Sequence, residues 1–185
     1  MCPCPGDYLL VLVSARRLGD RVTDLHTQRL LLHPVDVAEG ERIAARGPGS
    51  QDRWAADFPF DGDVLGVTAY LRATAAHGEQ RPFGFYRITR TADGQAIGGI
   101  GFKGQPTNGS VEIGYGLVPS ARGAGYAAEA LTALLVLAAD HGLDRVLADT
   151  EHSNIASQRT LERAGFTRRR SDGELSFYEA VLDSR

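Results

Sequence analysis

The chain has 185 residues, which is enough for one well-buried core and too few for two ordinary domains. Its apolar content of 43% and charged content of 23% are those of an ordinary globular protein, so the composition excludes a disordered or fibrous chain. A formal net charge of −3 provides no basic field for a phosphate backbone, and we therefore expect no nucleic-acid partner.

Two further features concern the surroundings of the protein. The longest apolar stretches, residues 8–13 and 131–139, fall well short of the roughly 20 residues that span a bilayer, so we expect no membrane partner. No basic residue precedes the first stretch, which is atypical of a secretion signal. Cys2 and Cys4 have no nearby histidine or third cysteine to complete a metal site, and we interpret them as free thiols. These features predict a cytoplasmic protein without a bound metal.

The first part of the chain predicts an appendage followed by a strand and two helices. Residues 1–22 contain early helix breakers and show no amphipathic plan, so we expect them to form an N-terminal appendage to a single domain of residues 23–185. After about residue 34, the spacing of apolar residues changes from the pattern of a strand to the pattern of helices. The predicted elements are a strand at 27–34, a helix at 35–46, and a helix that begins at a cap from Asp61 or Asp63 and ends at His77.

Three strands are expected in the middle of the chain. They occupy residues 83–89, 95–103 and 110–118. Asp93-Gly94 between the first two is typical of a hairpin turn, and Asn108-Gly109 precedes the third. The spacing therefore predicts an antiparallel meander.

After the meander the apolar period becomes helical again. Apolar residues recur from Ala127 to Ala138, and Gly142 stands where a helix would end in a left-handed residue. The remaining predicted elements are a strand at 145–150, a helix at 154–164, and a hairpin of strands at 166–170 and 174–182. This alternation indicates an α/β protein.

The segment 111–127 is the most informative stretch, because it runs from strand through turn to helix. Gly123 and Gly125 remove side chains where the helix begins, which exposes N–H groups that have no internal partner and carry the positive end of the helix dipole. Such a turn is able to hold a diphosphate, with Arg122 at its rim. Glycines also occur at helix starts for packing alone. A dinucleotide site is the other alternative, but its fingerprint requires a third glycine and a parallel strand, which are missing here.

Three motifs resemble the GNAT acetyltransferase superfamily. Residues 122–131, Arg-Gly-Ala-Gly-Tyr-Ala-Ala-Glu-Ala-Leu, match the end of its cofactor motif. Residues 27–32, Thr-Gln-Arg-Leu-Leu-Leu, are similar to the first strand of the branch that includes the ribosomal-protein N-terminal acetyltransferases. Asn154 to Ser157, followed by Leu161 to Phe166, resembles a helix of that branch. One departure is Ser120, which stands where the family usually has Gln or Arg.

This resemblance implies a fold and an activity. The fold is a mixed, mostly antiparallel sheet of six to seven strands, splayed between the strands that end near Val118 and Thr150, with helices on both faces. The activity is N-acetyl transfer from acetyl-coenzyme A to a primary amine, on a peptide N-terminus or a small molecule, by direct attack and without a metal. By analogy a homodimer is expected. Because Ser120 departs from the motif, a non-catalytic acyl-coenzyme A-binding regulatory domain is the alternative.

The resemblance also implies which residues bind the cofactor. The pantetheine arm would enter the splay and pair with main chain at its edge, and the diphosphate would lie on the glycine turn. The residues implied are Leu117, Val118, Arg122, Gly123, Ala124, Gly125, Tyr126, Ala127, Asn154 and Ser157. The backbone N–H near Leu117 would stabilise the oxyanion.

Two residues are candidates for the catalytic proton transfers. Deprotonating a lysine-like amine at neutral pH costs roughly 4 to 5 kcal/mol, whereas an α-amino group costs about 1 kcal/mol, so a base is needed most for the former. We expect Glu112, on the strand that enters the cofactor turn, to accept the proton directly or through water. Glu112 could instead pair with an arginine on a neighbouring strand. The helix at 154–164 contains no tyrosine, which leaves Ser157 as the candidate donor to the leaving thiolate, although Ser157 could simply bond backbone near the cap Asn154.

Aromatic residues of the early loop and the first meander strand are candidates for the acceptor pocket. They are Trp54, Phe58, Phe60 and Tyr86, with Glu112 beside them. Aromatic side chains at such positions also commonly belong to the core.

Overall fold

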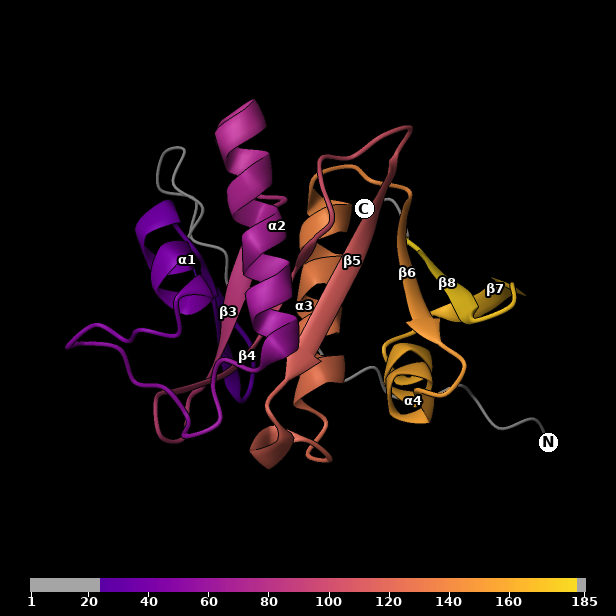
Figure 1. Cartoon of the computed structure of the whole chain (residues 1–185). Coiled ribbons are helices and arrows are strands. Elements are labelled where there is room, and N and C mark those ends of the chain that lie inside the picture. Colours follow the sequence, from indigo (N-terminus) through magenta and orange to yellow (C-terminus); the bar gives the residue numbers. More distant parts are fainter. Residues whose placement is uncertain (1–23, 183–185) are drawn as a thin grey trace.

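The computed structural model describes residues 24–182, which form one open mixed sheet of eight strands with helices packed against it (Figure 1). The strand order is β1-β2-β3-β4-β5-β6-β8-β7. The strands are β1 Leu25–His26, β2 Leu30–Pro34, β3 Phe85–Arg90, β4 Gln95–Phe102, β5 Ser110–Leu117, β6 Arg145–Glu151, β7 Thr167–Ser171 and β8 Leu175–Val181. The predicted appendage, residues 1–22, lies outside the described residues, as do Cys2 and Cys4.

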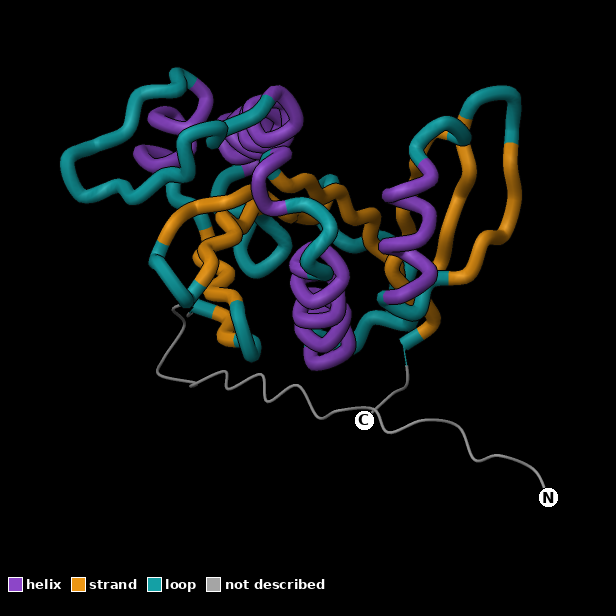
Figure 2. The backbone as a smooth tube through the Cα atoms, turned by 90° about the horizontal axis from the view of Figure 1, so that it is seen from below, coloured by secondary structure: helices purple, strands orange, loops and turns teal. Residues whose placement is uncertain are grey.

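Helices cover both faces of this sheet. Viewed from below, α1 and α2 lie on one side and α3 lies on the other (Figure 2), while α4 contacts α3 and β7. The helices are α1 Val37–Ala44, α2 Asp61–His77, α3 Tyr126–Asp140 and α4 Ile155–Arg163, with a 3-10 turn at Pro119–Ala121. The mixed, mostly antiparallel fold predicted from the sequence is confirmed.

Three details differ from the sequence-based predictions. The sheet has eight strands because the two-residue β1 adds an edge strand next to β2. Helix α1 begins at Val37, because Asp36 is its cap and accepts a hydrogen bond from the Glu39 N–H at 2.8 Å. The cap of α2 is Phe60, whereas Asp63 is the third helical residue and accepts from the Phe60 N–H.

The sheet splits between β5 and β6, as the family resemblance implied. These two parallel strands pair over only three positions, the last of which joins Glu112 to Leu147. Beyond this point β5 continues beside β4 and β6 continues beside β8, so the two strands diverge toward their carboxyl ends (Figure 1). The opened edge is where backbone groups of β5 become free to bind a ligand.

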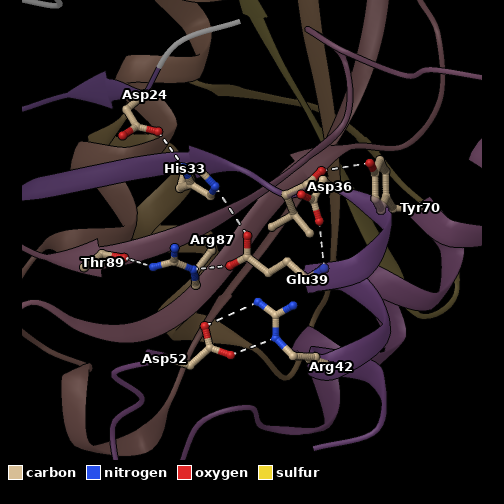
Figure 3. Close-up of polar contacts among 10 residues, drawn as sticks. Asp24, His33, Asp36, Glu39, Arg42, Asp52, Tyr70, Arg87 and Thr89 are labelled. Carbon is tan, nitrogen blue, oxygen red and sulfur yellow. Dashed lines mark hydrogen bonds and ion pairs between the residues drawn. The ribbon is translucent and has the colours of Figure 1, made fainter. Parts of the chain in front are cut away.

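A polar network links α1 to β2 and β3 (Figure 3). Glu39 is only 6% exposed, and its carboxylate contacts both Arg87 and His33. His33 in turn bonds Asp24 at 2.6 Å. Both oxygens of this buried carboxylate therefore have cationic or hydrogen-bonding partners, as the cost of burying a charge requires.

Candidate active site

The glycine turn before α3 is open to solvent. Gly123 and Gly125 have φ values of 80° and 81°, a left-handed conformation that suits glycine, and Gly125 is the residue that precedes the helix. A side chain at Gly123 would meet no atom within 4 Å. Arg122, Gly123 and Ala124 are exposed. The N–H groups at this helix start are thus accessible to an anion.

The turn is fixed by the strand that opens the domain. Glu129, in the first turn of α3, accepts hydrogen bonds from the Thr27 hydroxyl at 2.6 Å and from the Arg29 N–H at 2.8 Å. The Arg29 guanidinium also bonds Glu129 and the Ala124 carbonyl and lies over the Tyr126 ring. Two motifs about 100 residues apart in the sequence therefore meet here. Because of these bonds, the turn is held in place before a ligand arrives.

A groove of about 480 Å³ runs from this turn to the splay. It is lined by the turn, the end of β5 and the outer side of α4, and three arginines stand along it: Arg122, Arg159 and Arg163. A groove with exposed N–H groups at a helix start and several guanidinium groups suits an extended ligand that carries phosphates. Of the predicted cofactor residues, Leu117, Arg122, Gly123, Gly125, Tyr126, Ala127, Asn154 and Ser157 line it.

At the end of β5, the backbone N–H groups of Leu117 and Val118 point to opposite sides of the strand. The Val118 N–H donates to the Ile97 carbonyl at 3.0 Å and is therefore committed to β4. Because successive strand residues point their backbone groups in opposite directions, Leu117 directs its N–H and carbonyl toward the splay. The Leu117 carbonyl accepts from Arg122 Nε at 2.9 Å. Leu117 is thus the residue of this pair whose backbone faces the groove.

Ser120 faces away from the groove. Its hydroxyl bonds the Asp57 carboxylate at 2.8 Å and its N–H bonds the same carboxylate at 2.9 Å. These two bonds hold the pKa of Asp57 below its usual value. The residue that departs from the family motif therefore links the cofactor turn to the loop before α2.

Ser157 is placed by the cap of α4 and by a tyrosine that the sequence analysis did not select. The Asn154 side chain accepts from the Ser157 N–H at 3.0 Å, which is the expected cap. The Ser157 hydroxyl lies 2.9 Å from the Tyr115 hydroxyl. Burial raises the pKa of Tyr115 to about 12, so this phenol keeps its proton at neutral pH. Tyr115 lies on β5, and only its register on the sheet brings it to α4.

A second cavity, of about 620 Å³, lies between α2 and the sheet. Its floor is a patch of four glycines without side chains: Gly99 and Gly101 on β4 stand directly opposite Gly116 and Gly114 on β5. Its walls are mostly apolar, formed by Leu65, Ala69, Tyr70, Ala73, Phe83, Phe85 and Phe102. This cavity shares Tyr115 and Gly116 with the groove. The two hollows therefore meet at the end of β5.

The aromatic residues proposed for the acceptor lie largely elsewhere. Trp54 packs edge-on against the buried Phe58, and Tyr86 is fully buried with its hydroxyl bonded to the Pro82 carbonyl. None of these three lines the cavity. Phe60 lines the groove, and its ring covers Gly116 so closely that a Cβ there would lie 2.3 Å from it. Trp54, Phe58 and Tyr86 therefore belong to the hydrophobic core or pack against it. Other aromatic residues line the cavity.

Glu112 lies beside the start of the splay. It contacts Lys103, the residue that follows β4, and Lys103 also contacts Asp149 at 2.5 Å. Burial and the adjacent Asp149 carboxylate raise the pKa of Glu112, and Lys103 opposes this shift. Glu112 lines neither the groove nor the glycine-floored cavity, although Lys103 lines the latter. Gly116 comes four positions after Glu112, which is roughly 13 Å along a strand.

No helix among residues 24–182 is long and apolar enough to cross a membrane. The same range holds no cluster of three or more His, Cys, Asp or Glu side chains able to bind a metal ion.

The geometry defines a class: an α/β protein with an anion-binding glycine turn at a splayed sheet edge and an adjoining apolar cavity. Comparison with known proteins agrees. The family model described as an acetyltransferase (GNAT) domain matches residues 29–167. The chain is 29% identical over 153 residues to an uncharacterised N-acetyltransferase, YjdG, of Bacillus subtilis (strain 168), covering 77% of this chain and 88% of that protein.

Solved structures show the same fold. A putative GNAT-family acetyltransferase from Bordetella pertussis is 27% identical, with a TM-score of 0.61, over 85% of this chain and 99% of that one. The ribosomal L7/L12 α-N-protein acetyltransferase RimL, solved with coenzyme A, is 18% identical, with a TM-score of 0.63, over 86% and 97% of the two chains.

The chain therefore belongs to the GNAT acetyltransferase family. It is an acetyltransferase, and acetyl-coenzyme A is the acetyl donor that this family uses. These matches support the enzyme and give no support to the non-catalytic regulatory domain. The open turn, the row of arginines and the splay fit this donor.

Proposed function

We propose that the protein acetylates a primary amine that enters the glycine-floored cavity while the donor lies in the groove. The observation that carries this proposal is the meeting of the two hollows at Tyr115 and Gly116. The reacting carbonyl would lie at the end of β5, where the Leu117 N–H faces the splay as a donor to the oxyanion. Direct attack then requires no covalent intermediate on the protein.

Ser157 is proposed as the proton donor to the leaving sulfur, with Tyr115 behind it. Its hydroxyl lines the groove and is hydrogen-bonded to a phenol that stays protonated. A proton given up by Ser157 is replaced from Tyr115 within the same hydrogen bond. This pair supplies a phenolic proton although helix α4 contains no tyrosine.

Glu112 is proposed as a proton acceptor that acts through water. Its distance from the end of β5 excludes a direct contact with an amine at Gly116. Lys103 contacts Glu112 and also lines the cavity. A water that connects Glu112 to the amine would therefore lie near Lys103.

The test is release of free coenzyme A thiol from acetyl-coenzyme A over a panel of α-amino peptides and small amines. We expect release with at least one class of amine. Tight binding of acetyl-coenzyme A without thiol release across peptides, polyamines, aminoglycosides and apolar amines would reject the proposal.

A further inference from the structure

Asp63 is a buried carboxylate whose two oxygens differ. It is 2% exposed. Its Oδ2 accepts a hydrogen bond from the Phe60 N–H at 3.1 Å, as a side chain in the first turn of a helix commonly does. Its Oδ1 is buried and receives no hydrogen bond of good geometry from residues 24–182, and the Gly99 backbone N–H is the further polar group near this carboxylate. Helix capping therefore accounts for the burial of Oδ2. The burial of Oδ1 costs free energy that no such bond offsets.

The other buried carboxylate that the structure describes, Glu39, shows what a structural role requires. Glu39 contacts Arg87 and His33, so its charge is compensated (Figure 3). Arg46 is the cation whose charge acts on the pKa of Asp63. Its guanidinium, however, is hydrogen-bonded to Asp61 and to the Pro59 carbonyl. Asp63 is thus a buried acid without a bonded cation among the described residues, and a cationic ligand would supply one.

Asp63 lies in the cavity that adjoins the groove. Asp63 lines the glycine-floored cavity together with Gly99 and Gly116, which are paired across β4 and β5. Gly116 also lines the donor groove. The residue that Asp63 bonds, Phe60, lies with its ring directly over Gly116. Asp63 therefore lines one of the two hollows that meet at Gly116, whereas Glu112 lines neither.

The surroundings of Asp63 keep it able to exchange a proton near neutral pH. Burial raises its pKa to about 7, against the opposing effects of the Phe60 and Gly99 backbone N–H groups and of Arg46. The facing sheet patch consists of glycines, and the other titratable groups of the cavity are Tyr70, Lys103 and Tyr115. A base with a pKa near the working pH is well matched to an amine that arrives protonated.

We propose that Asp63 binds the ammonium group of a small primary amine with an apolar body and takes one of its protons. This assignment rests on the proposed function and names the acceptor class for it. The cavity offers one buried carboxylate, apolar and aromatic walls, and the cation Lys103, so it fits a monoamine and disfavours polyamines or aminoglycosides, whose further charges would find no partner. A volume of about 620 Å³ is that of an ordinary small-ligand pocket.

The proton balance follows from this placement. The ammonium gives one proton to Asp63, and the free amine attacks the acetyl carbon, so that the C–N bond forms as the C–S bond breaks. The nitrogen loses its second proton through water to Glu112, and water returns one proton to the Ser157–Tyr115 pair, which has given one to the sulfur. Asp63 returns its proton to solvent through water in the cavity.

The test compares Asp63→Asn with Asp61→Asn. Both changes remove one carboxylate from the first turn of α2, but the Asp61 side chain is fully exposed and paired only with Arg46. With 2-phenylethylamine as acceptor, we expect Asp63→Asn to lower kcat/KM at least 100-fold and to remove the acidic limb near pH 7. Acetyl-coenzyme A affinity should stay within twofold, which also shows that the variant is folded. Asp61→Asn should behave as wild type. Spermidine and kanamycin should be poor acceptors.

A binding measurement separates this inference from the proposed function. Calorimetry of 2-phenylethylamine with the coenzyme A-bound wild type at pH 7, in buffers of different ionisation enthalpy, should show release of about half a proton, because the bound ammonium ionises Asp63. If this release occurs in wild type and not in Asp63→Asn while no amine is acetylated, the function fails and the inference holds. Full activity of Asp63→Asn, absence of proton release, or a preference for polyamines or peptides overturns the inference.

Discussion

The groove proposed for the donor and the cavity proposed for the acceptor meet at Gly116 but have different linings. The groove is formed mainly by residues 115–128 and 154–163, and its polar groups are backbone N–H groups, three arginines and the side chains of Asn154, Ser157 and Thr160. The cavity is assembled from α2, β3, β4 and β5, its walls are apolar side chains, and its buried acid is Asp63. Because acyl-coenzyme A donors share one diphosphate, backbone N–H groups and arginines suffice to hold it, whereas selection among amines requires a pocket shaped by apolar side chains.

The sharpest way to separate the two hollows is to fill one of them. Ala69 is exposed on α2 and lines the cavity, so Ala69→Trp places a large side chain at its mouth. We expect kcat/KM for the amine to fall at least 100-fold while the acetyl-coenzyme A dissociation constant, measured by calorimetry, stays within twofold. Ala75→Trp, on an exposed part of the same helix outside the cavity, is the matched control and should leave both values unchanged. Equal loss of donor binding in Ala69→Trp would mean that the hollows are not separate sites.

The converse change acts on the groove. Gly125→Val puts a β-branched residue at φ 81° and covers N–H groups at the start of α3. Loss of one charge-assisted hydrogen bond is worth roughly 1.5 to 3 kcal/mol, so we expect acetyl-coenzyme A affinity to fall roughly 10- to 100-fold. Gly142→Val carries similar strain at φ 74° at the other end of the same helix, without touching the groove. A comparable loss of affinity in Gly142→Val would attribute the effect to instability of the helix.

The same contrast explains which parts could be predicted from the sequence. The groove could be predicted because a local run of residues, Arg122 to Leu131, specifies both the helix start and the glycines that expose it. The order of elements also followed from apolar periods and turn residues, and the splay followed from the resemblance. Helix α1 was predicted two residues too long at its start because Asp36, a strong cap, was not recognised.

The cavity could not be predicted in this way because its parts are far apart in the sequence. Asp63 reads as a helix cap, and only the packing of α2 on β4 and β5 shows that one of its oxygens lacks a partner. Gly99 and Gly114 read as ordinary strand glycines until their register brings four glycines together. Tyr115 reaches Ser157 across 42 positions of sequence. One signal was available: glycines alternate along both strands, which leaves room on one face of the sheet for the rings of Phe60 and Phe85.

Substitutions of Ser157 and Glu112 test which residues transfer protons: Ser157, which lines the groove, or Glu112, which lines neither hollow. Ser157→Ala removes the hydroxyl that Tyr115 contacts, and Glu112→Gln removes the negative charge beside Lys103. We expect each to lower turnover about tenfold or more in steady-state assays, with little change in donor affinity. Tyr115→Phe combined with Ser157→Ala should cost little more than Ser157→Ala alone, because the two hydroxyls act as one unit. Full activity of both Ser157→Ala and Glu112→Gln would refute these roles.

Ser120 is expected to give the smallest effect of all. In a motif that binds diphosphate, a change at this position would normally be severe, but here the Ser120 side chain bonds Asp57 on the exposed surface of the loop before α2. Ser120→Ala removes that bond and keeps the N–H contact to the same carboxylate, and exposed contacts of this kind contribute little to stability. We therefore expect donor affinity and turnover to change less than twofold. A tenfold loss of donor affinity, measured by calorimetry, would show that Ser120 turns toward the groove when the donor binds. Ser120 would then count among the residues that bind the donor.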